Sequence, residues 1–293
     1  MSFKSGVILI LLSAAAWGIG GVCGQYLYQF HAVTAPWLIA VRQVLAGLIF
    51  LGYLLLRGEN IFRIFADKRD AKDQLAFSFL GLLGAQFGFY YTISLCNAAM
   101  ATVLQYTSPV FVMLWMSFKS RSMPEGRELL GIVFALVGVF LISTHGDINN
   151  VVLSPLALVI GIISAISLAF YTVQPMRLLS KFSTTLVVGW GQLLSGALLC
   201  MFVNPFSPTG HWDMGAFIAF VYLVIGATVL SYSLFLVGLK VVGSTKASLI
   251  SCAEPLASII AVVVWLKTPL TLIDLAGMAC IIITVVLLSL PKK

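Results

Sequence analysis

The chain has 293 residues, of which 60% are hydrophobic and only 9% are charged, and its formal net charge is +7 at pH 7. A soluble protein carries roughly 25% charged residues, and the mean hydropathy here is +1.06. Composition therefore excludes a water-soluble domain and predicts an integral membrane protein. The basic residues fall mostly at the ends of apolar runs, where membrane orientation explains them better than nucleic-acid binding.

Windowed hydropathy predicts an all-α fold with ten transmembrane helices, since each crossing needs about 20 apolar residues. The connections between them are short, which leaves no room for a separate soluble domain. The first apolar run is long enough to span and lacks a small-residue cleavage site, so we expect no cleavable signal peptide. The predicted spans cover residues 6–27, 36–56, 75–95, 98–117, 126–144, 154–176, 184–203, 214–238, 246–266 and 271–290.

The Lys and Arg residues predict the orientation of these spans. Fifteen of the seventeen fall on one side, Lys267 falls alone on the other, and Arg42 lies inside the second span. Cytoplasmic loops carry the excess of Lys and Arg, so both termini are expected to be cytoplasmic in a multi-pass protein of the cytoplasmic membrane, surrounded by lipid. The longest connection, residues 58–74, is expected to form a brief interfacial helix on that side.

An internal repeat connects the two halves of the chain. The segment that begins at Phe89 aligns with the one that begins at Phe235, at an offset of 146 residues (235 minus 89). Pro109 falls on Pro255 at the same offset (255 minus 109). The aligned segments predict helix breaks at both prolines, because proline removes a backbone donor.

The second and seventh spans also correspond, with Gln43 paired to Gln192 and Gly47 to Gly196. Residues 1–147 and 151–293 are therefore expected to be two copies of one five-helix unit. Because five is odd, the second copy enters the membrane inverted. Two inverted copies can open a central site to either side alternately.

The motifs in this order resemble a known family. They are WG at residues 17–18 in LLSAAAWGIGGVCGQYL, the arginine of IAVRQVLAGL, YY at 90–91, ATVLQYTSPVFVMLW from residue 101, and EP at 254–255. Together they resemble the drug/metabolite transporter superfamily, EamA type. The resemblance implies ten helices and transport of amino acids or other small metabolites, often outward. It also implies a central cavity lined mainly by the first, third, fourth, sixth, eighth and ninth spans.

The halves differ in their chemistry. Ser108 stands before Pro109 where Glu254 stands before Pro255, so only one half carries the carboxylate. The sixth span has Leu168 where the first span has Trp17. This divergence suits an asymmetric substrate.

Polar and small residues recur on one face of the ninth helix and of its counterpart, the fourth. Either close helix packing or a cavity wall explains such a face. The two sets are Ala247, Ser251, Glu254, Ser258 and Ala261, and Ala101, Gln105, Ser108, Val112 and Trp115.

Glu254 has three open roles. It could exchange protons to couple transport, pair with a substrate amine or quaternary ammonium, or hydrogen-bond as a neutral acid to the backbone loosened around Pro255. Arg42 could hold a substrate carboxylate. Its long side chain could also reach the interface. A structural role for Arg42, either anchoring the helix or pairing within the protein, is favoured because the second span is peripheral in the resembling fold.

Aromatic residues on the inner helices could form a cage around a substrate or simply fill the bundle. The predicted substrate-binding residues are Trp17, Tyr90, Tyr91, Gln105, Tyr106, Ser108, Tyr171, Tyr232, Ser251 and Glu254.

No metal or cofactor is expected. The five cysteines form no CxxC pair and are interpreted as core residues. His31, His145 and His211 fall in predicted external loops, where scattered loop histidines are favoured over a metal site or a proton sensor. No nucleotide-binding motif of the G-x-x-x-x-G-K-[ST] kind occurs, so ATP is not expected to drive the protein directly.

The sequence therefore predicts a secondary transporter that exports an amino acid or related small polar metabolite, with protons as one candidate for coupling. Uptake of a quaternary ammonium such as choline and lipid flipping remain alternatives. An intramembrane enzyme is disfavoured, because the predicted spans offer one mid-membrane carboxylate and no mid-membrane histidine. Either a monomer or a homodimer fits.

Overall fold

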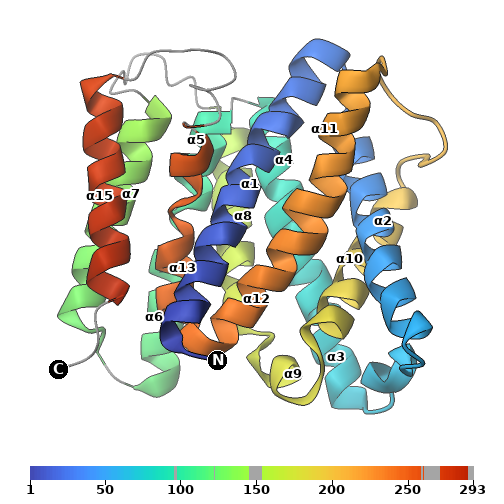
Figure 1. Cartoon of the computed structure of the whole chain (residues 1–293), viewed down its shortest axis with the longest axis horizontal. Helices are drawn as coiled ribbons and strands as arrows, with labels where there is room; N and C mark the ends of the chain where they lie inside the picture. Colours follow the sequence, from blue (N-terminus) through green and yellow to red (C-terminus); the bar gives the residue numbers. More distant parts are fainter. Residues whose placement is uncertain (96–97, 122, 145–153, 259, 261–270, 290–293) are drawn as a thin grey trace.

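A computed structural model shows the chain as a bundle of helices (Figure 1). The structure describes residues 1–95, 98–121, 123–144, 154–258, 260 and 271–289. Every regular element in these ranges is a helix, as predicted, and no strand occurs among them. The predicted boundary between the halves, at residues 147–151, lies outside the described residues, as do His145, Ala261 and the end of the predicted ninth span.

Among the described residues, five helical segments are long and apolar enough to cross a membrane. Two of them contain a π-helix, named η2 and η3. The segments are α1 (Phe3–His31), α2 (Ala35–Leu56), α3–η2–α4 (Lys68–Ala76, Phe77–Leu83, Gly84–Leu95), α8–α9 (Pro155–Val173, Met176–Lys181) and α11–η3–α12 (Met214–Val224, Ile225–Leu230, Ser231–Val242).

The other described elements are shorter. They are the 3₁₀-helix η1 (Ile61–Phe65), α5 (Ala98–Gln105), α6 (Ser108–Ser120), α7 (Gly126–Thr144), α10 (Thr184–Cys200), α13 (Ser244–Ser251) and α15 (Leu272–Ser289). The connection at residues 58–74 thus holds η1 and the start of α3. The count of ten spans stays a prediction.

Large apolar side chains face outward on many of these helices. Leu48 is 53% exposed, Ile218 61% and Phe118 88%. Such extensive apolar surface is rare on a soluble monomer, whereas in a bilayer it contacts lipid. The chain is therefore a multi-pass membrane protein.

Polar side chains determine where several helices begin. Ser154 accepts a hydrogen bond from the backbone N–H of Ala157, and Asp213 accepts one from that of Ala216. Asp67 starts α3 by accepting from the N–H groups of Asp70 and Arg69. Each bond satisfies a donor that the first turn leaves free. The bond from Asp70, with the others, holds the pKa of Asp67 below its usual range.

Helices from the two halves pack directly on each other. The main pairs are α2 with α10, α1 with α12, α4 with α8, and α7 with α15. Two glycines bring α2 and α10 close: a Cβ on Gly47 would lie 2.5 Å from the nitrogen of Leu193, and one on Gly196 would lie 2.6 Å from that of Val44. The contacts are reciprocal, since each helix contributes one glycine and receives the other.

Two helices are interrupted in the middle of the bundle. Between α5, which ends at Gln105, and α6, which begins at Ser108, two residues form a turn. A second turn follows α13, and helical residues resume at Glu254. Pro109 and Pro255 each lie directly after the residue at which the helix resumes, where the missing N–H costs no helical hydrogen bond.

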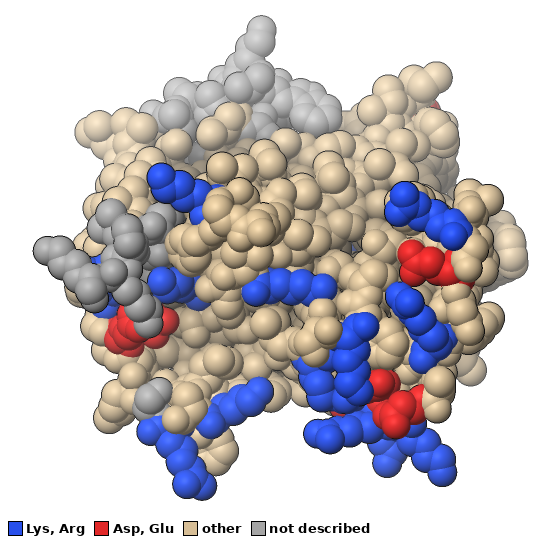
Figure 2. Space-filling view, turned by 60° about the horizontal axis from the view of Figure 1, so that its bottom comes forward, with Lys and Arg blue, Asp and Glu red and all other residues tan. Residues whose placement is uncertain are grey.

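Lys and Arg side chains are spread over one end of the bundle. Figure 2 shows them on the face that carries the N-terminus, α3 and α9 in Figure 1. This is the side on which the sequence places the cytoplasmic loops.

Candidate functional site

A cavity lies between the helices of both halves, lined from α1, α2, α4, α5, α8, α12 and α13, the two π-helices and the two helix breaks. Its volume is about 60 Å³, counted by the positions that the centre of a water molecule can take. One water needs about 10–15 Å³ on this measure. The cavity therefore has room for a small solute rather than a bulky one.

Eight of the ten predicted binding residues line this cavity. They are Trp17, Tyr90, Gln105, Tyr106, Tyr171, Tyr232, Ser251 and Glu254. The other two lie elsewhere: Tyr91 stacks on Phe87 with ring centres 5.4 Å apart, and Ser108 is buried at the start of α6.

The two helix breaks meet at one side of the cavity. Tyr106, in the first break, places its hydroxyl 3.0 Å from the carbonyl oxygen of Ser251 and 2.5 Å from Oε2 of Glu254, which lie directly before and after the turn of the second break. A carbonyl released by a helix break inside a membrane needs a partner, and Tyr106 supplies one. The first break thus stabilises the second.

The residues predicted on one face of the fourth span (residues 98–117) and of the ninth span (residues 246–266) fall into two groups. Some line the cavity and others pack against neighbouring helices. Gln105 lines the cavity and also donates to the hydroxyl of Ser164 and the carbonyl of Ala85. Ser258 instead donates to the carbonyl of Gly18, while Ala101 and Ala247 are buried outside the cavity wall.

Gly18 of α1 allows the second break to approach. A Cβ there would lie 2.5 Å from the carbonyl oxygen of Glu254 and 3.0 Å from the nitrogen of Ser258. Both are backbone atoms, which cannot rotate away. The WG pair therefore has two roles, with Trp17 in the cavity wall and Gly18 at a close helix contact.

Aromatic rings form much of the cavity wall. Tyr232 makes edge contacts with Trp17, at 5.0 Å between ring centres, and with Tyr171, at 5.7 Å. The Trp17 Nε1 and the Tyr171 hydroxyl are buried and have no hydrogen-bond partner among the described residues. Tyrosine and tryptophan usually satisfy such groups when buried, so these are two unsatisfied donors on residues of the cavity wall.

Arg42 agrees with one of its two predicted structural roles and not with the other. Its side chain does not reach the interface: the residue is 2% exposed and lines the cavity. Nη1 donates to the Tyr90 hydroxyl at 2.8 Å and Nη2 to Gln86 Oε1 at 2.5 Å. Anchoring at the interface is therefore wrong, because α2 turns this face toward α4 and the centre of the bundle. The bonds to Tyr90 and Gln86 agree with the other predicted structural role, pairing within the protein.

Arg42 is one of ten lining residues that were not among the predicted binding residues. The charge of Arg42 inside a span could have marked it as a lining residue, whereas nothing in the hydropathy pattern distinguishes the other nine from residues that face elsewhere. They are Arg42, Leu82, Ala85, Gln86, Phe89, Leu168, Thr172, Ala227, Phe235 and Ser248.

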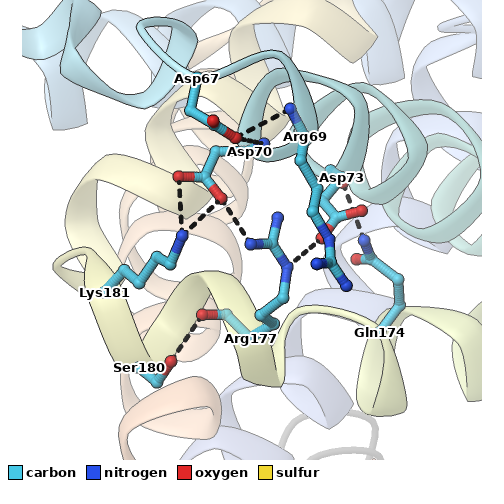
Figure 3. A network of polar contacts seen from close by, with 8 residues as sticks. All are labelled: Asp67, Arg69, Asp70, Asp73, Gln174, Arg177, Ser180 and Lys181. Carbon is cyan, nitrogen blue, oxygen red and sulfur yellow. Dashed lines mark hydrogen bonds and ion pairs between the residues drawn. The ribbon is translucent and has the colours of Figure 1, made fainter.

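A network of ion pairs and hydrogen bonds joins α3 to α9 at the Lys- and Arg-rich end of the bundle (Figure 3). Asp70 of α3 is buried and accepts from Arg177 Nη1 at 2.7 Å and from Lys181 Nζ at 3.2 Å. Arg177 Nε donates to Asp73 at 2.6 Å, and Gln174 donates to the Asp73 carbonyl. The network fastens the start of α3–η2–α4 to the end of α8–α9, two segments that both line the cavity.

The opposite end holds a smaller polar contact. His31 ends α1 and is buried rather than lying in a loop, with Nδ1 3.1 Å from the carbonyl oxygen of His211 and Nε2 3.8 Å from Asp213. In the described part of the chain, no cluster of His, Cys, Asp and Glu has the makings of a metal site.

Comparison with known proteins identifies the family. The sequence model of the EamA-like transporter family matches residues 4–144 and again residues 155–290. The chain belongs to the EamA-like transporter family. The predicted resemblance is thereby confirmed.

Relatives in this family cover nearly the whole chain. YicL of Salmonella typhimurium, an uncharacterized inner membrane transporter, is 37% identical over 100% of this chain and 97% of its own. The threonine/homoserine exporter RhtA of Escherichia coli K12 is 26% identical over 94% and 88%. A crystal structure of a protein 18% identical in sequence superposes with a TM-score of 0.80 over 97% of this chain and 96% of its own, which shows a shared fold.

Proposed function

We propose that this EamA-like protein is a secondary transporter that exports an amino acid or a similar small polar metabolite across the cytoplasmic membrane. The observation that carries the proposal is the cavity at the meeting point of the two helix breaks, where charged and aromatic groups face a space sized for a small solute. The inner membrane relative YicL supports the location, and the exporter RhtA supports the substrate class and direction.

The transport cycle that we propose is alternating access between two inverted five-helix repeats, making ten spans. Three observations support it. The family model matches once in each half, the main helix pairs cross between the halves with reciprocal glycine contacts, and the two breaks begin at residues 106 and 252, at the offset of 146 found in the sequence (252 minus 106). Discontinuous helices at a repeat interface are the usual site of substrate binding in such carriers.

Glu254 is the proposed coupling residue. The Tyr106 hydroxyl has one hydrogen to donate but faces two oxygens, those of Ser251 and Glu254. If Glu254 carries a proton, it can donate to Tyr106 while Tyr106 donates to Ser251, and both contacts are satisfied. Loss of that proton would leave one hydrogen for two acceptors, so protonation of Glu254 favours the joined breaks and can bias the cycle.

The alternatives fit the site less well. The guanidinium of Arg42 in the cavity wall repels a quaternary ammonium such as choline. A phospholipid headgroup is large for a cavity of about 60 Å³. Both termini are proposed to be cytoplasmic, which the Lys- and Arg-rich face in Figure 2 supports.

The direct test is transport by purified protein in liposomes without ATP. We expect at least one labelled compound, from a panel of amino acids that includes threonine and homoserine, to leave protein-containing liposomes faster than protein-free ones. If every amino acid in the panel leaves protein-containing and protein-free liposomes at the same rate, the proposed substrate class is refuted.

A further inference from the structure

The Arg42 guanidinium is a buried cation held only by neutral groups. Nη1 and Nη2 donate to Tyr90 and Gln86, and Cζ lies 4.6 Å from the centre of the Tyr90 ring. Nε has no hydrogen-bond partner in the described part of the chain. Arginine keeps its charge at any physiological pH, so burial cannot be relieved by losing a proton.

No carboxylate in the described ranges forms an ion pair with Arg42. Glu59 pairs with Arg63, Asp70 and Asp73 pair on the charged face, and Asp213 contacts His31. Glu254 lines the same cavity but contacts Tyr106. Buried charges are normally paired, because an unpaired one is strongly unfavourable.

A purely structural role does not require this charge. Neutral donors could equally bond the Tyr90 hydroxyl and the Gln86 carbonyl, and so tie α2 to α4. The neighbouring residue Gln43 is also polar and fully buried on α2, but it does not line the cavity. Arg42, by contrast, presents a cation to a solute-sized space.

We infer that Arg42 binds a carboxylate group of the transported molecule; this inference rests on the proposed function. The guanidinium offers several N–H donors in a planar fork that suits a carboxylate. The Tyr171 hydroxyl and the Trp17 Nε1 are further unsatisfied donors in the same wall. Glu254, in the same cavity, offers carboxyl oxygens that can accept hydrogen bonds from an ammonium group. A small α-amino acid matches this arrangement, whereas an amine without a carboxylate leaves Arg42 unpaired.

The test is a thermal-shift series on the full-length protein in detergent. The probes are threonine, homoserine and alanine, their carboxamides, and sodium chloride at matched concentration. A ligand that binds only the folded state raises the melting temperature. For the wild type we expect at least one free amino acid to raise it, and the matched carboxamide and chloride to have no comparable effect.

Variants separate the charge from the fold. Arg42→Gln keeps hydrogen-bonding capacity for Tyr90 and Gln86 but removes the charge, and we expect at least a tenfold loss of apparent affinity for the free acid. Arg42→Lys should restore part of it. Gln43→Met, on the same helix but outside the cavity wall, should bind like the wild type.

Several results would overturn the inference. They are equal stabilisation by acid and carboxamide, stabilisation by chloride alone, no stabilisation of the wild type by any free acid, and undiminished acid binding by Arg42→Gln. If Arg42→Gln does not fold, the test rests on Arg42→Met and on the comparison of free acid with carboxamide in the wild type.

The melting temperature reports binding and not transport. Carboxylate binding without flux in liposomes would therefore refute the transport proposal and leave the Arg42 site standing. Flux that is unchanged in Arg42→Gln would refute only the site.

Discussion

The Tyr106 hydroxyl lies 2.5 Å from Oε2 of Glu254, and the two residues come from the breaks of two different helices. Tyr106 also reaches the carbonyl that the second break releases at Ser251. The two discontinuous helices are therefore joined through one side chain at the wall of the cavity. Any movement that separates the helices must break this contact first.

Tyr106→Phe should weaken the joined state. The change leaves the Ser251 carbonyl without its donor and the Glu254 carboxyl without its hydrogen-bond partner, which costs about 1–3 kcal/mol. We expect a lower melting temperature in detergent and slower transport in liposomes. Tyr91→Phe is the matched control, since Tyr91 lies outside the cavity wall, and it should behave like the wild type. Equal melting temperatures for Tyr106→Phe and the wild type would argue against a link between the breaks.

Gly18→Ala should impair the protein through backbone contact alone. Its Cβ would lie 2.5 Å from the Glu254 carbonyl oxygen, so α1 or the second break must shift, at a cost of about 1–3 kcal/mol. Gly21→Ala, on the same helix, places its Cβ where nothing lies within 4 Å and serves as the control. We expect reduced transport and a lower melting temperature for the first variant and neither for the second. Normal transport by Gly18→Ala would show that the close approach is dispensable.

Asp70→Asn tests the charge network of Figure 3. Asp70 has a 6% exposed side chain and faces both Arg177 and Lys181. Arg177 keeps its pair with Asp73 and is 28% exposed, so the variant leaves no buried charge unpaired. We expect the loss of hydrogen bonds between charged groups to cost about 1.5–3 kcal/mol. Thermal melting in detergent measures the loss. Glu59→Gln, which removes an exposed pair with Arg63, should change stability by less than about 1 kcal/mol. Similar melting temperatures for the two variants would show that the network contributes little.

Motif position and the repeat predicted much of this site. Glu254 and the two prolines stand out because a carboxylate and a helix breaker are unusual inside apolar runs, and Trp17 stands out because it belongs to the WG motif of the family resemblance. The offset between the halves pointed to the two interrupted helices. Membrane insertion constrains such features strongly, so they are visible in sequence alone.

The direction in which individual side chains point could not be predicted in the same way. Tyr90 and Tyr91 are adjacent and chemically identical, yet successive helical residues point about 100° apart, and only Tyr90 lines the cavity. For Arg42 the sequence leaves the interface, pairing within the protein and a substrate carboxylate all open, because an apolar span has no polar face to orient the side chain. The π-helices η2 and η3 have no hydropathy signature, although each turns residues into the cavity wall.

Transport driven by a pH gradient, measured with Glu254→Gln beside the wild type in liposomes, tests the central claim most directly. The probe is the amino acid with the largest wild-type flux, and the observable is its accumulation against a concentration gradient. We predict that the wild type accumulates it when the pH gradient is imposed. Glu254→Gln, which cannot exchange a proton, should only equilibrate it. Accumulation by Glu254→Gln to the wild-type level would contradict the coupling role of Glu254.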